Sequence, residues 1–453
     1  MQPFAPQILG LRSLQSHPPI DTGRAFVHSR PAIGWTVEML DSVRSVAVVG
    51  AGIVGVCAAL YLRRAGLQVT VIDPLPPGGA TSFGNAGMVR HDCNVPLAMP
   101  GMLRQVPGWL ADPLGPLVLR PRYALTAAPW LLRWIRAGRM DRVNKAADAL
   151  AILHRDNLDC YRDLIGGPAF DDLIRKVGGI QVWESEAHGL SDRITTSINA
   201  RQGVVTEPLS RQDLQRLLPG ISAIARRGLL YPDNAHTINP LRLVTAICDG
   251  VRRADGVFAA EHVLKIIPRE AGGYMLMTNT ANRKADAVVI AAGAWSNRLL
   301  EPLGFSLPME TERGYHLMLP SPSIELPMPI QMKNRGFALT PMEHGLRLAG
   351  TVEIAGLEAP PDERRSEILL THARALFPEL NGGEPTMWMG YRPSLPDSVP
   401  AIGQVPGHGS LFVAAGHGHT GMIGGGSTGR LVAELVTGSP TFINPTPYAP
   451  DRF

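Results

Sequence analysis

Residues 45–74, SVAVVGAGIVGVCAALYLRRAGLQVTVIDP, constrain the fold more than any other stretch of the chain. The apolar run 46–49 predicts a short buried parallel strand, and a second strand is expected over 68–73. Between them, apolar residues continue to Leu62 and predict a helix, which Gly66 ends. Strand, glycine turn, helix and strand in this order are typical of a dinucleotide-binding unit. The sequence therefore predicts an α/β protein with a Rossmann-like cofactor domain.

The glycine turn of this unit carries the spacing G-x-G-x-x-G at Gly50, Gly52 and Gly55. Gly50 allows the tight turn, Gly52 lets a pyrophosphate approach the backbone, and Gly55 lets the helix pack closely on the sheet. The free N–H groups of the helix N-terminus then face the phosphates. Asp73, at the tip of the second strand, is placed to accept hydrogen bonds from both hydroxyls of an adenosine ribose. These residues predict a dinucleotide site without distinguishing NAD from FAD.

A stretch of small residues, GGATSFGNAGMV at 78–89, favours FAD. An extended FAD needs backbone groups and small hydroxyls, here Thr81 and Ser82, along its ribityl chain and flavin edge, whereas an NAD domain does not need such a stretch. A plain glycine-rich loop is the alternative. The strand end VVIAAGAWSN at 288–297 also stops on small residues, which let another group approach the backbone. We therefore expect Ala292 and Gly293 to lie beside the cofactor.

A second G-x-G-x-x-G occurs near the C-terminus, at Gly416, Gly418 and Gly421. The helix after it leads into SPTFINPTPY, without a second strand or an acidic residue at a strand tip, so we predict no second nucleotide fold. With no separate NAD(P)H site, the flavin is expected to be reduced by the small substrate itself. The glycines at 424–426 are expected to leave N–H groups free for the electron-rich edge of the reduced flavin.

The composition fits a globular enzyme and disfavours several other classes of protein. The 43 basic and 39 acidic side chains among 453 residues give a net charge of +4, too small to indicate a nucleic-acid surface. The four cysteines are scattered without CxxC or metal-ligand spacing, so we expect no metal site and a reducing, cytoplasmic compartment. No apolar run reaches the length of a membrane span. The chain is too long for one core, so two domains are expected.

Residues 96–145 depart from this even charge distribution, because they hold eight basic residues, two acidic residues and three of the seven tryptophans. Basic residues with tryptophan are typical of a helix that lies on anionic lipid. Substrate-domain helices whose arginine heads are in water are the first interpretation of this segment. Peripheral contact with the inner face of the membrane through residues 96–145 is the alternative.

Taken together, the motifs of residues 45–440 resemble those of the FAD-dependent amino-acid oxidoreductases of the D-amino-acid dehydrogenase and glycine oxidase type. The resemblance rests on GAGIVG with Asp73, ATSFGNAGM, AEHVLKI, ADAVVIAAGAWS, WMGYRPSLPDSVPAIG and AAGHGHTGMIGG. It implies a discontinuous Rossmann-like FAD-binding domain (45–95, 236–303 and 386–440) and a mixed-sheet α+β substrate-binding domain (96–235 and 304–385). Residues 1–44 are then a poorly ordered extension, with an over-long gene start or a targeting segment as alternatives, and 441–453 are a C-terminal tail.

The resemblance also implies the residues of the site. Arg392 matches the arginine that grips the substrate carboxylate, and Tyr315 and His316 are expected to line the pocket from a strand of the substrate domain. Relatives with covalent flavin use a histidine or a cysteine where this chain has Gly84 and the cysteine-free WMGYRPSLPDS, so FAD is expected to be non-covalent. The expected cofactor contacts are Gly50, Ala51, Gly52, Gly55, Asp73, Thr81, Ser82, Ala86, Gly87, Met88, Val263, Ala292, Gly293, His417, Gly418, His419, Thr420, Gly421, Met422 and Ile423. The two histidines in this set are interpreted as hydrogen-bonding or packing residues rather than as acids or bases.

The implied activity is oxidative deamination of a D-amino acid. A hydride leaves Cα for flavin N5, and the imino acid then hydrolyses to a 2-oxo acid and ammonia. One alternative is an oxidase or dehydrogenase of glycine, sarcosine or a cyclic imino acid such as D-hydroxyproline. Two others are a flavoprotein acting on a modified RNA base and a non-catalytic flavin-binding subunit of a larger complex. The expected electron acceptor is a membrane quinone, with O2 as the alternative.

Overall fold

The computed structural model describes residues 43–90 and 92–453. Apart from Val43 and Arg44, the extension expected over residues 1–44 lies outside the described residues.

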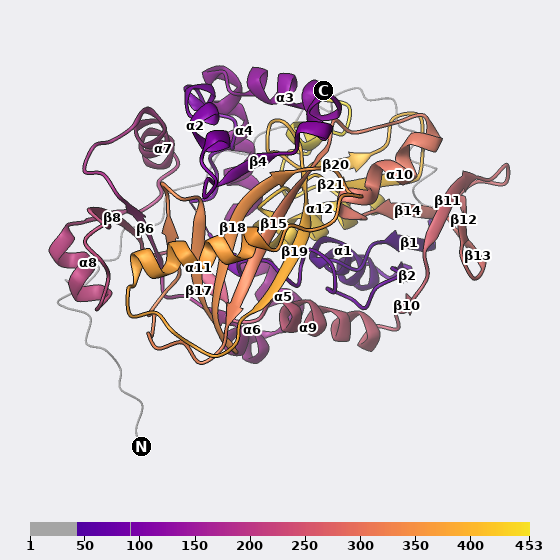
Figure 1. The fold of residues 1–453 in the computed structure, drawn as a ribbon. Coiled ribbons are helices and arrows are strands. Elements are labelled where there is room, and N and C mark those ends of the chain that lie inside the picture. The colour runs from indigo at the N-terminus through magenta and orange to yellow at the C-terminus, as the bar shows by residue number, and fades with distance from the viewer. Residues whose placement is uncertain (1–42, 91) are drawn as a thin grey trace, which may run out of the picture. The chain divides into compact units, whose positions relative to one another are not determined.

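The first sheet has six strands in the order β10-β2-β1-β14-β21-β20 (Figure 1). Adjacent strands within this sheet are parallel, except that β20 is antiparallel to β21. The central strands are almost wholly buried, since both faces of the sheet are covered. The bounds are β1 Ser45–Val49, β2 Gln68–Ile72, β10 Val257–Ala259, β14 Ala287–Ile290, β20 Ala401–Gln404 and β21 Leu411–Ala415. This sheet confirms the predicted Rossmann-like α/β arrangement.

One face of this sheet packs against α1 (Ile53–Arg64), α9 (Pro240–Arg253) and α12 (Gly421–Thr437). A Cβ atom on Gly429 would lie 2.6 Å from the backbone carbon of Cys57, so α12 approaches α1 too closely for any other residue. The apolar sides of α4 (Met140–Arg155), α5 (Asn157–Ile165) and α6 (Gly167–Leu173) join the same core. These three helices come from the stretch expected in the substrate domain, but their apolar faces are buried against the cofactor-domain helices.

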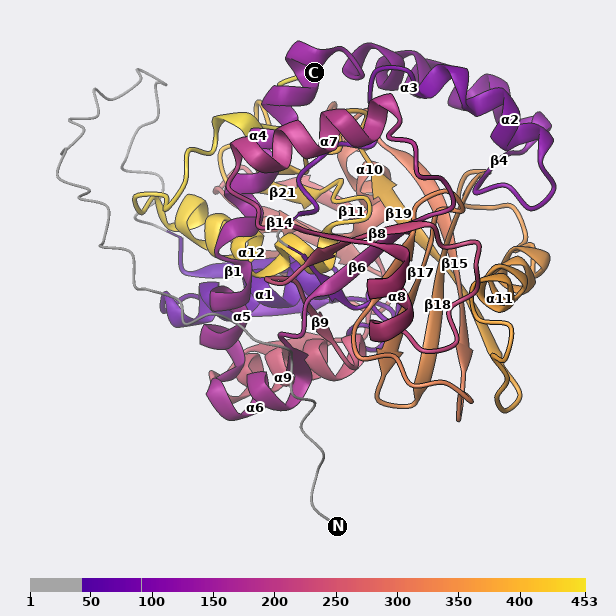
Figure 2. The same cartoon turned by 90° about the vertical axis from the view of Figure 1, so that its left-hand side faces the viewer.

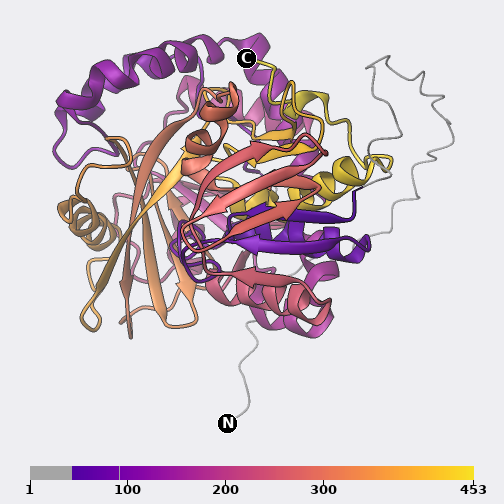
Figure 3. The same cartoon turned by 90° about the vertical axis from the view of Figure 1, so that its right-hand side faces the viewer.

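The other face of the six-stranded sheet carries a three-stranded antiparallel sheet (Figure 3). Ile266 and Leu276 of this sheet join a core with Val288 and Ile290 of β14. Its strands are β11 Val263–Pro268, β12 Tyr274–Thr278 and β13 Asn282–Ala285, and the short helices η4 (Gly293–Trp295), α10 (Ser296–Leu300) and η5 (Glu301–Leu303) follow β14.

The second large sheet has nine mostly antiparallel strands in the order β19-β15-β18-β17-β16-β6-β8-β7, with β4 paired to β18. Helix α11 (Arg364–Leu376) crosses one face of it (Figure 1) and closes a core with Leu317, Leu348 and Leu369. The bounds are β4 Leu117–Leu119, β6 Gly179–Trp183, β7 Glu207–Leu209, β8 Arg227–Tyr231, β15 Glu310–Leu319, β16 Ile330–Met332, β17 Phe337–Met342, β18 Gly345–Ile354 and β19 Thr386–Ser394. Strand β19, expected in the cofactor domain, therefore belongs to this sheet.

The remaining elements connect the two large sheets. A small sheet of β3 (Met88–Val89), β9 (Ala235–Thr237) and β5 (Ile174–Arg175) joins three distant segments. In Figure 2, α2 (Val106–Ala111) and α3 (Ala124–Ala137) follow one another, with β4 beside α2. The other bounds are α7 Leu190–Arg201, α8 Arg211–Leu217, η2 Met102–Arg104, η3 Pro121–Tyr123 and η6 Thr446–Tyr448. Within the described residues, no helix combines the length and apolar character needed to cross a bilayer.

Candidate active site

A cavity of about 570 Å³ opens at the carboxyl ends of β1, β2, β14 and β21. Ligands of open α/β sheets bind at this edge. Of the expected cofactor contacts, those on the cavity wall are Gly50, Gly52, Asp73, Thr81, Ser82, Val263, Ala292, Gly293, His417, Gly418, Gly421 and Met422. The structure thus brings together residues from every motif that follows a strand of the six-stranded sheet.

The turn after β1 can be built only with glycine at two positions. Gly50 has φ +113°, and a Cβ atom there would lie 2.3 Å from the carbonyl oxygen of Ala291. A Cβ atom on Gly55 would lie 2.0 Å from the carbonyl oxygen of Gly50, so Gly55 supports the turn without lining the cavity. The strand end at Ala291 is therefore small for two reasons, because it contacts this turn and also forms part of the cavity wall.

Asp73 is held at the tip of β2 by two backbone N–H groups. Its carboxylate accepts hydrogen bonds from Ala51 N at 2.7 Å and Leu75 N at 2.8 Å. Burial raises the pKa of Asp73 above its ordinary value, although these two bonds act in the opposite direction. Ala51 is buried and does not line the cavity, so its expected contact with the cofactor stays a prediction.

The small-residue segment divides between the cavity and the neighbouring sheets. Thr81 and Ser82 line the cavity, and Thr81 Oγ1 donates to the carbonyl oxygen of Tyr391 at 2.8 Å, which ties the loop to β19. Ala86, Gly87 and Met88 were expected at the cofactor but do not line the cavity. The chain turns away at Gly87, which has φ +73°, and enters β3. Asn85 takes their place on the wall.

The late glycine loop is likewise only partly on the wall. His417 lines the cavity, its Nε2 lies 3.0 Å from Thr428 Oγ1, and burial lowers its pKa to about 4, so it is neutral near pH 7. His419, Thr420 and Ile423 do not line this cavity. The glycines at 424–426 do not present free N–H groups to the cofactor as expected. They lie inside α12, and Cβ atoms on them would contact buried side chains of α1, α4 and α5.

The residues present fit an extended dinucleotide. The cavity is lined by the glycine turn, the buried N-terminal end of α1 and the carboxylate of Asp73, and also by Thr81, Gly293 and His417. Ser82 lies at the N-terminus of α1, where its hydroxyl accepts a hydrogen bond from Ile53 N at 3.0 Å. The wall includes the apolar side chains of Val49, Ile53, Ile72 and Met422, as expected for a site that buries aromatic rings. These features match the separate needs of phosphates, ribose and a flavin ring.

Arg392 projects from β19 on the same face as Trp388, whose ring packs against Gly84 of the 78–87 segment, called the cofactor loop below. Its guanidinium crosses β15 over Gly314, where a Cβ atom would lie 2.1 Å from Cζ of Arg392. Nη1 donates to the carbonyl oxygen of Thr351 at 2.8 Å and Nη2 to that of Gly350 at 3.4 Å. A bulge in β18 turns these carbonyls toward the arginine, and Thr351 has φ +54° there. Among the described residues, no carboxylate lies within ion-pair distance of this guanidinium.

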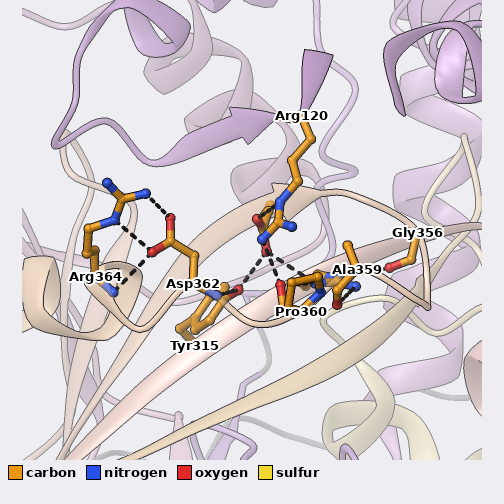
Figure 4. A network of polar contacts seen from close by, with 9 residues as sticks. Arg120, Tyr315, Gly356, Ala359, Pro360, Asp362 and Arg364 are labelled. Atoms are coloured by element: carbon orange, nitrogen blue, oxygen red, sulfur yellow. Dashed lines mark hydrogen bonds and ion pairs between the residues drawn. The ribbon is translucent and has the colours of Figure 1, made fainter. Parts of the chain in front are cut away.

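Tyr315 lies on the opposite face of the sheet, so the expectation that it lines the pocket is wrong. Side chains alternate along β15, and Tyr315 faces α11 with Arg313, while its neighbour His316 faces the cofactor loop. The Tyr315 hydroxyl donates to Glu353 Oε2 at 2.6 Å and accepts from Asp362 N at 3.0 Å (Figure 4). Only 2% of Tyr315 is exposed.

The network around Tyr315 fixes the strand that carries the bulge. Arg120, just after β4, donates to Glu353 Oε1 at 2.6 Å and to the carbonyl oxygen of Pro360 at 2.8 Å (Figure 4). The buried Arg313 donates to the carbonyl oxygens of Gly356, Ala359 and Pro360. These bonds hold β18 and the 356–362 segment together behind Arg392.

His316 is on the predicted face but is covered by the cofactor loop. Its Nδ1 lies 3.0 Å from the carbonyl oxygen of Gly84, and its ring stacks on Trp388 with centroids 5.0 Å apart. Burial and the charge of Arg347 lower its pKa to about 4. His316 therefore supports the loop as a neutral ring and does not line the cavity.

The model of the family described as FAD dependent oxidoreductase matches residues 45–435. The chain belongs to this family. It is therefore an FAD-dependent oxidoreductase, as the motifs predicted, and the cavity that fits the cofactor is lined by Gly50, Gly52, Asp73, Thr81 and Ser82.

Individual relatives cover nearly the whole oxidoreductase. A D-amino-acid oxidase of Bradyrhizobium diazoefficiens is 36% identical over 90% of this chain and 99% of the relative. A D-amino acid dehydrogenase of Allorhizobium ampelinum is 30% identical over 90% of this chain and 98% of the relative. Among solved structures, glycine oxidase from Geobacillus kaustophilus gives a TM-score of 0.68 at 22% identity, covering 90% of this chain and 99% of that one. At that identity the structural match supports the fold alone.

Several residues of the oxidoreductase's site had no signal in the sequence. Arg347 on β18 donates to the carbonyl oxygens of Phe83 at 3.0 Å and Asn85 at 2.6 Å, and these two bonds attach the cofactor loop to the nine-stranded sheet. Burial lowers its pKa to about 10, so it remains charged near pH 7. Glu261, His262, Trp295 and Arg298 also line the cavity. Three of these could have been foreseen, because Glu261 and His262 belong to AEHVLKI and Trp295 directly follows the Ala-Gly-Ala strand end.

The described residues contain no group of three or more His, Cys, Asp or Glu side chains that could hold a metal ion. The four cysteines are unpaired, and Cys57, Cys160 and Cys248 are buried.

Proposed function

We propose that this oxidoreductase removes a hydride from Cα of a D-amino acid, giving an imino acid that hydrolyses to a 2-oxo acid and ammonia. The observation that carries the proposal is the unpaired guanidinium of Arg392 beside the cofactor loop. Arginine has five N–H donors, and Arg392 uses two of them on backbone carbonyls. The remaining donors fit a substrate carboxylate, and the names of the relatives agree with an amino-acid substrate.

In this proposal the chain's own residues bind and orient the substrate, while bound FAD supplies the hydride acceptor. A guanidinium binds a carboxylate through two parallel bonds, so Arg392 fixes the orientation of Cα as well as the charge. The carbonyls of Thr351 and Gly350 fix the guanidinium itself. Gly314 leaves the space in which the arginine crosses the sheet.

The proposal is tested by anaerobic bleaching of the flavin near 450 nm with D-amino acids, L-amino acids, glycine, sarcosine and hydroxyproline isomers. We expect rapid bleaching by D-isomers. Bleaching only by glycine, sarcosine or a cyclic imino acid would show that the substrate is one of these compounds and not a D-amino acid. No bleaching by any of them, at full FAD occupancy, would favour the flavin-binding subunit.

Non-covalent attachment of FAD is part of this proposal. At the position where some relatives carry a linking histidine, the chain has Gly84, and a Cβ atom there would lie 1.9 Å from the ring of Trp388. No larger residue fits at that position. The test is denaturation in acid followed by filtration, which should release all yellow colour from the protein.

We also propose that the 96–145 segment rests on anionic lipid, which favours a quinone as electron acceptor over O2. In α3, Leu125 is 89% exposed, and Leu132 and Ile135 are exposed beside Arg133 and Arg136. Further exposed residues of the segment are Leu103, Arg104, Leu110, Leu114, Arg122, Arg139, Met140, Arg142 and Lys145. Exposed apolar side chains among cations match the chemistry of an anionic bilayer surface.

Two of the three tryptophans of this segment do not support the lipid contact as the sequence suggested. Trp130 is buried and its Nε1 donates to the carbonyl oxygen of Ser394 at 3.1 Å, while Trp134 lines a cavity inside the fold. The apolar side chains of α3 are therefore the ones to test. Sedimentation with phosphatidylglycerol vesicles should fall for the double variant Leu125→Glu, Leu132→Glu, and remain unchanged for Val257→Glu, an exposed control on β10.

A further inference from the structure

A buried carboxylate and a histidine from distant segments meet next to Arg392. Glu312 of β15 accepts a hydrogen bond from His419, in the loop before α12, with Nε2 and Oε2 2.7 Å apart. Glu312 is buried, whereas the His419 side chain is 32% exposed. Both line a small cavity of about 40 Å³ together with Ser394, His417 and Gly418. The pair therefore borders open space beside residues of the cofactor cavity.

Glu312 and Arg392 stand directly opposite each other in the β15–β19 register. Residues paired in this way have side chains on the same face of a sheet. Burial alone would raise the pKa of Glu312, but the hydrogen bond from His419 and the charges of His419 and Arg392 lower it below its ordinary value. The sheet thus presents a cation and an anion side by side. The cation could bind the carboxylate of an amino acid, and the anion lies on the side of its ammonium group.

An amino acid cannot lose hydride from Cα while its nitrogen is an ammonium. The C=N bond of the imino acid needs the nitrogen lone pair, and the ammonium has none. Near neutral pH most of the substrate arrives as the ammonium, because amines of this kind are basic. One proton must therefore leave the nitrogen before the hydride leaves carbon, either to water before binding or to a group in the site.

We propose that His419, oriented by Glu312, accepts this proton, an inference that rests on the proposed function. The ammonium N–H bond breaks, its electron pair stays on nitrogen, and the proton forms a new N–H bond at Nδ1 of the neutral imidazole. Nε2–H already donates to Glu312, and no described residue hydrogen-bonds to Nδ1. The products are a neutral amine and an imidazolium that is paired with a carboxylate. This is the relation between a base and its orienting carboxylate.

The other titratable groups around the pair leave this assignment intact. Arg392 faces it from β19, where burial lowers the pKa of the guanidinium and the charge of Glu312 acts in the opposite direction. Glu310, two residues before Glu312, is held by the Tyr123 hydroxyl of η3 at 3.1 Å. His417 is kept neutral by burial. Burial raises the pKa of Cys93, which faces the pair from the 92–97 segment, so it stays a thiol.

The test is the pH dependence of kcat/KM from about pH 6 to about pH 10 for wild type, His419→Asn and Glu312→Gln. Without the imidazole, only substrate that arrives as the free amine can react. His419→Asn should lose roughly 100-fold at neutral pH and recover toward wild type near pH 10. Glu312→Gln removes the negative charge that favours the imidazolium. In this variant the decrease of kcat/KM on the acid side should therefore begin at lower pH, and the maximal kcat/KM should fall. The two variants are thus expected to shift this decrease in opposite directions.

A matched control is His344→Asn, which removes an exposed histidine that also lies beside a glutamate. It should keep the wild-type profile. A wild-type pH profile in His419→Asn, or a loss that is equal at every pH, would overturn the proposal. If His419→Asn fails to bind FAD, the direction of the shift in Glu312→Gln decides. Failure of wild type to bleach with any amino acid would instead remove the proposed function.

Discussion

Replacing Arg392 by alanine tests the central assignment of the site. The structure leaves three N–H donors of this guanidinium for a ligand, enough for the two parallel bonds of a carboxylate. Charge-assisted hydrogen bonds contribute about 1.5–3 kcal/mol each. Loss of two such bonds corresponds to about 3–6 kcal/mol, so kcat/KM should fall by about 100-fold at least.

The assay is stopped-flow reduction of the flavin under anaerobic conditions, with FAD occupancy measured for each variant. Arg392→Lys is the matched variant, because it keeps the charge but loses the planar pair of bonds, and it should lie between wild type and alanine. An amine that lacks the carboxylate should react equally slowly with all three proteins. A loss smaller than about threefold in Arg392→Ala, with normal FAD binding, would refute the reasoning.

Three further predictions follow from neighbouring contacts. Gly314→Ala puts a methyl group 2.1 Å from Cζ of Arg392 and should displace the guanidinium. We expect kcat/KM to fall roughly 100-fold while FAD binding is retained, and equilibrium titration with FAD will distinguish loss of activity from loss of the cofactor. Tyr315→Phe leaves Glu353 and Asp362 N without this partner and should lower the free energy of unfolding by about 1–3 kcal/mol with KM unchanged, as urea denaturation and steady-state kinetics will show. Burial lowers the pKa values of His236, His316 and His417 from 6.5 to about 4, so below pH 6.5 the unfolded chain binds protons that the folded chain does not. Urea denaturation should therefore show that the free energy of unfolding falls between about pH 6.5 and about pH 4, and a free energy that does not change with pH would contradict this prediction.

The cofactor half of the site was predictable because its determinants are local. The turn at Gly50 and Gly52, the carboxylate of Asp73 and the small strand end at Ala292 each follow from the backbone geometry of a few adjacent residues. Ala86, Gly87 and Met88 do not line the cavity, because the chain turns away at Gly87 and pairs with β9, which no short motif shows.

The substrate half depends on register and on contacts between distant segments. Tyr315 and His316 are adjacent, and only the pairing of β15 decides which of them faces the cofactor loop. The bond between Glu312 and His419 joins residues 107 positions apart, so no short motif contains it. Trp130 and Trp134 looked like lipid anchors from composition, but α3 packs that side on β19.

Strand β4 pairs with β18 at Val352, Glu353 and Ile354, next to the bulge whose carbonyls hold Arg392. The segment proposed to contact lipid is thus continuous, through one sheet, with the residues proposed to bind substrate. Whatever free energy substrate adds to lipid binding, lipid must add to substrate binding, because linkage between two ligands is reciprocal. A vesicle titration with and without a substrate analogue therefore measures how strongly the fold couples the proposed lipid binding to substrate binding.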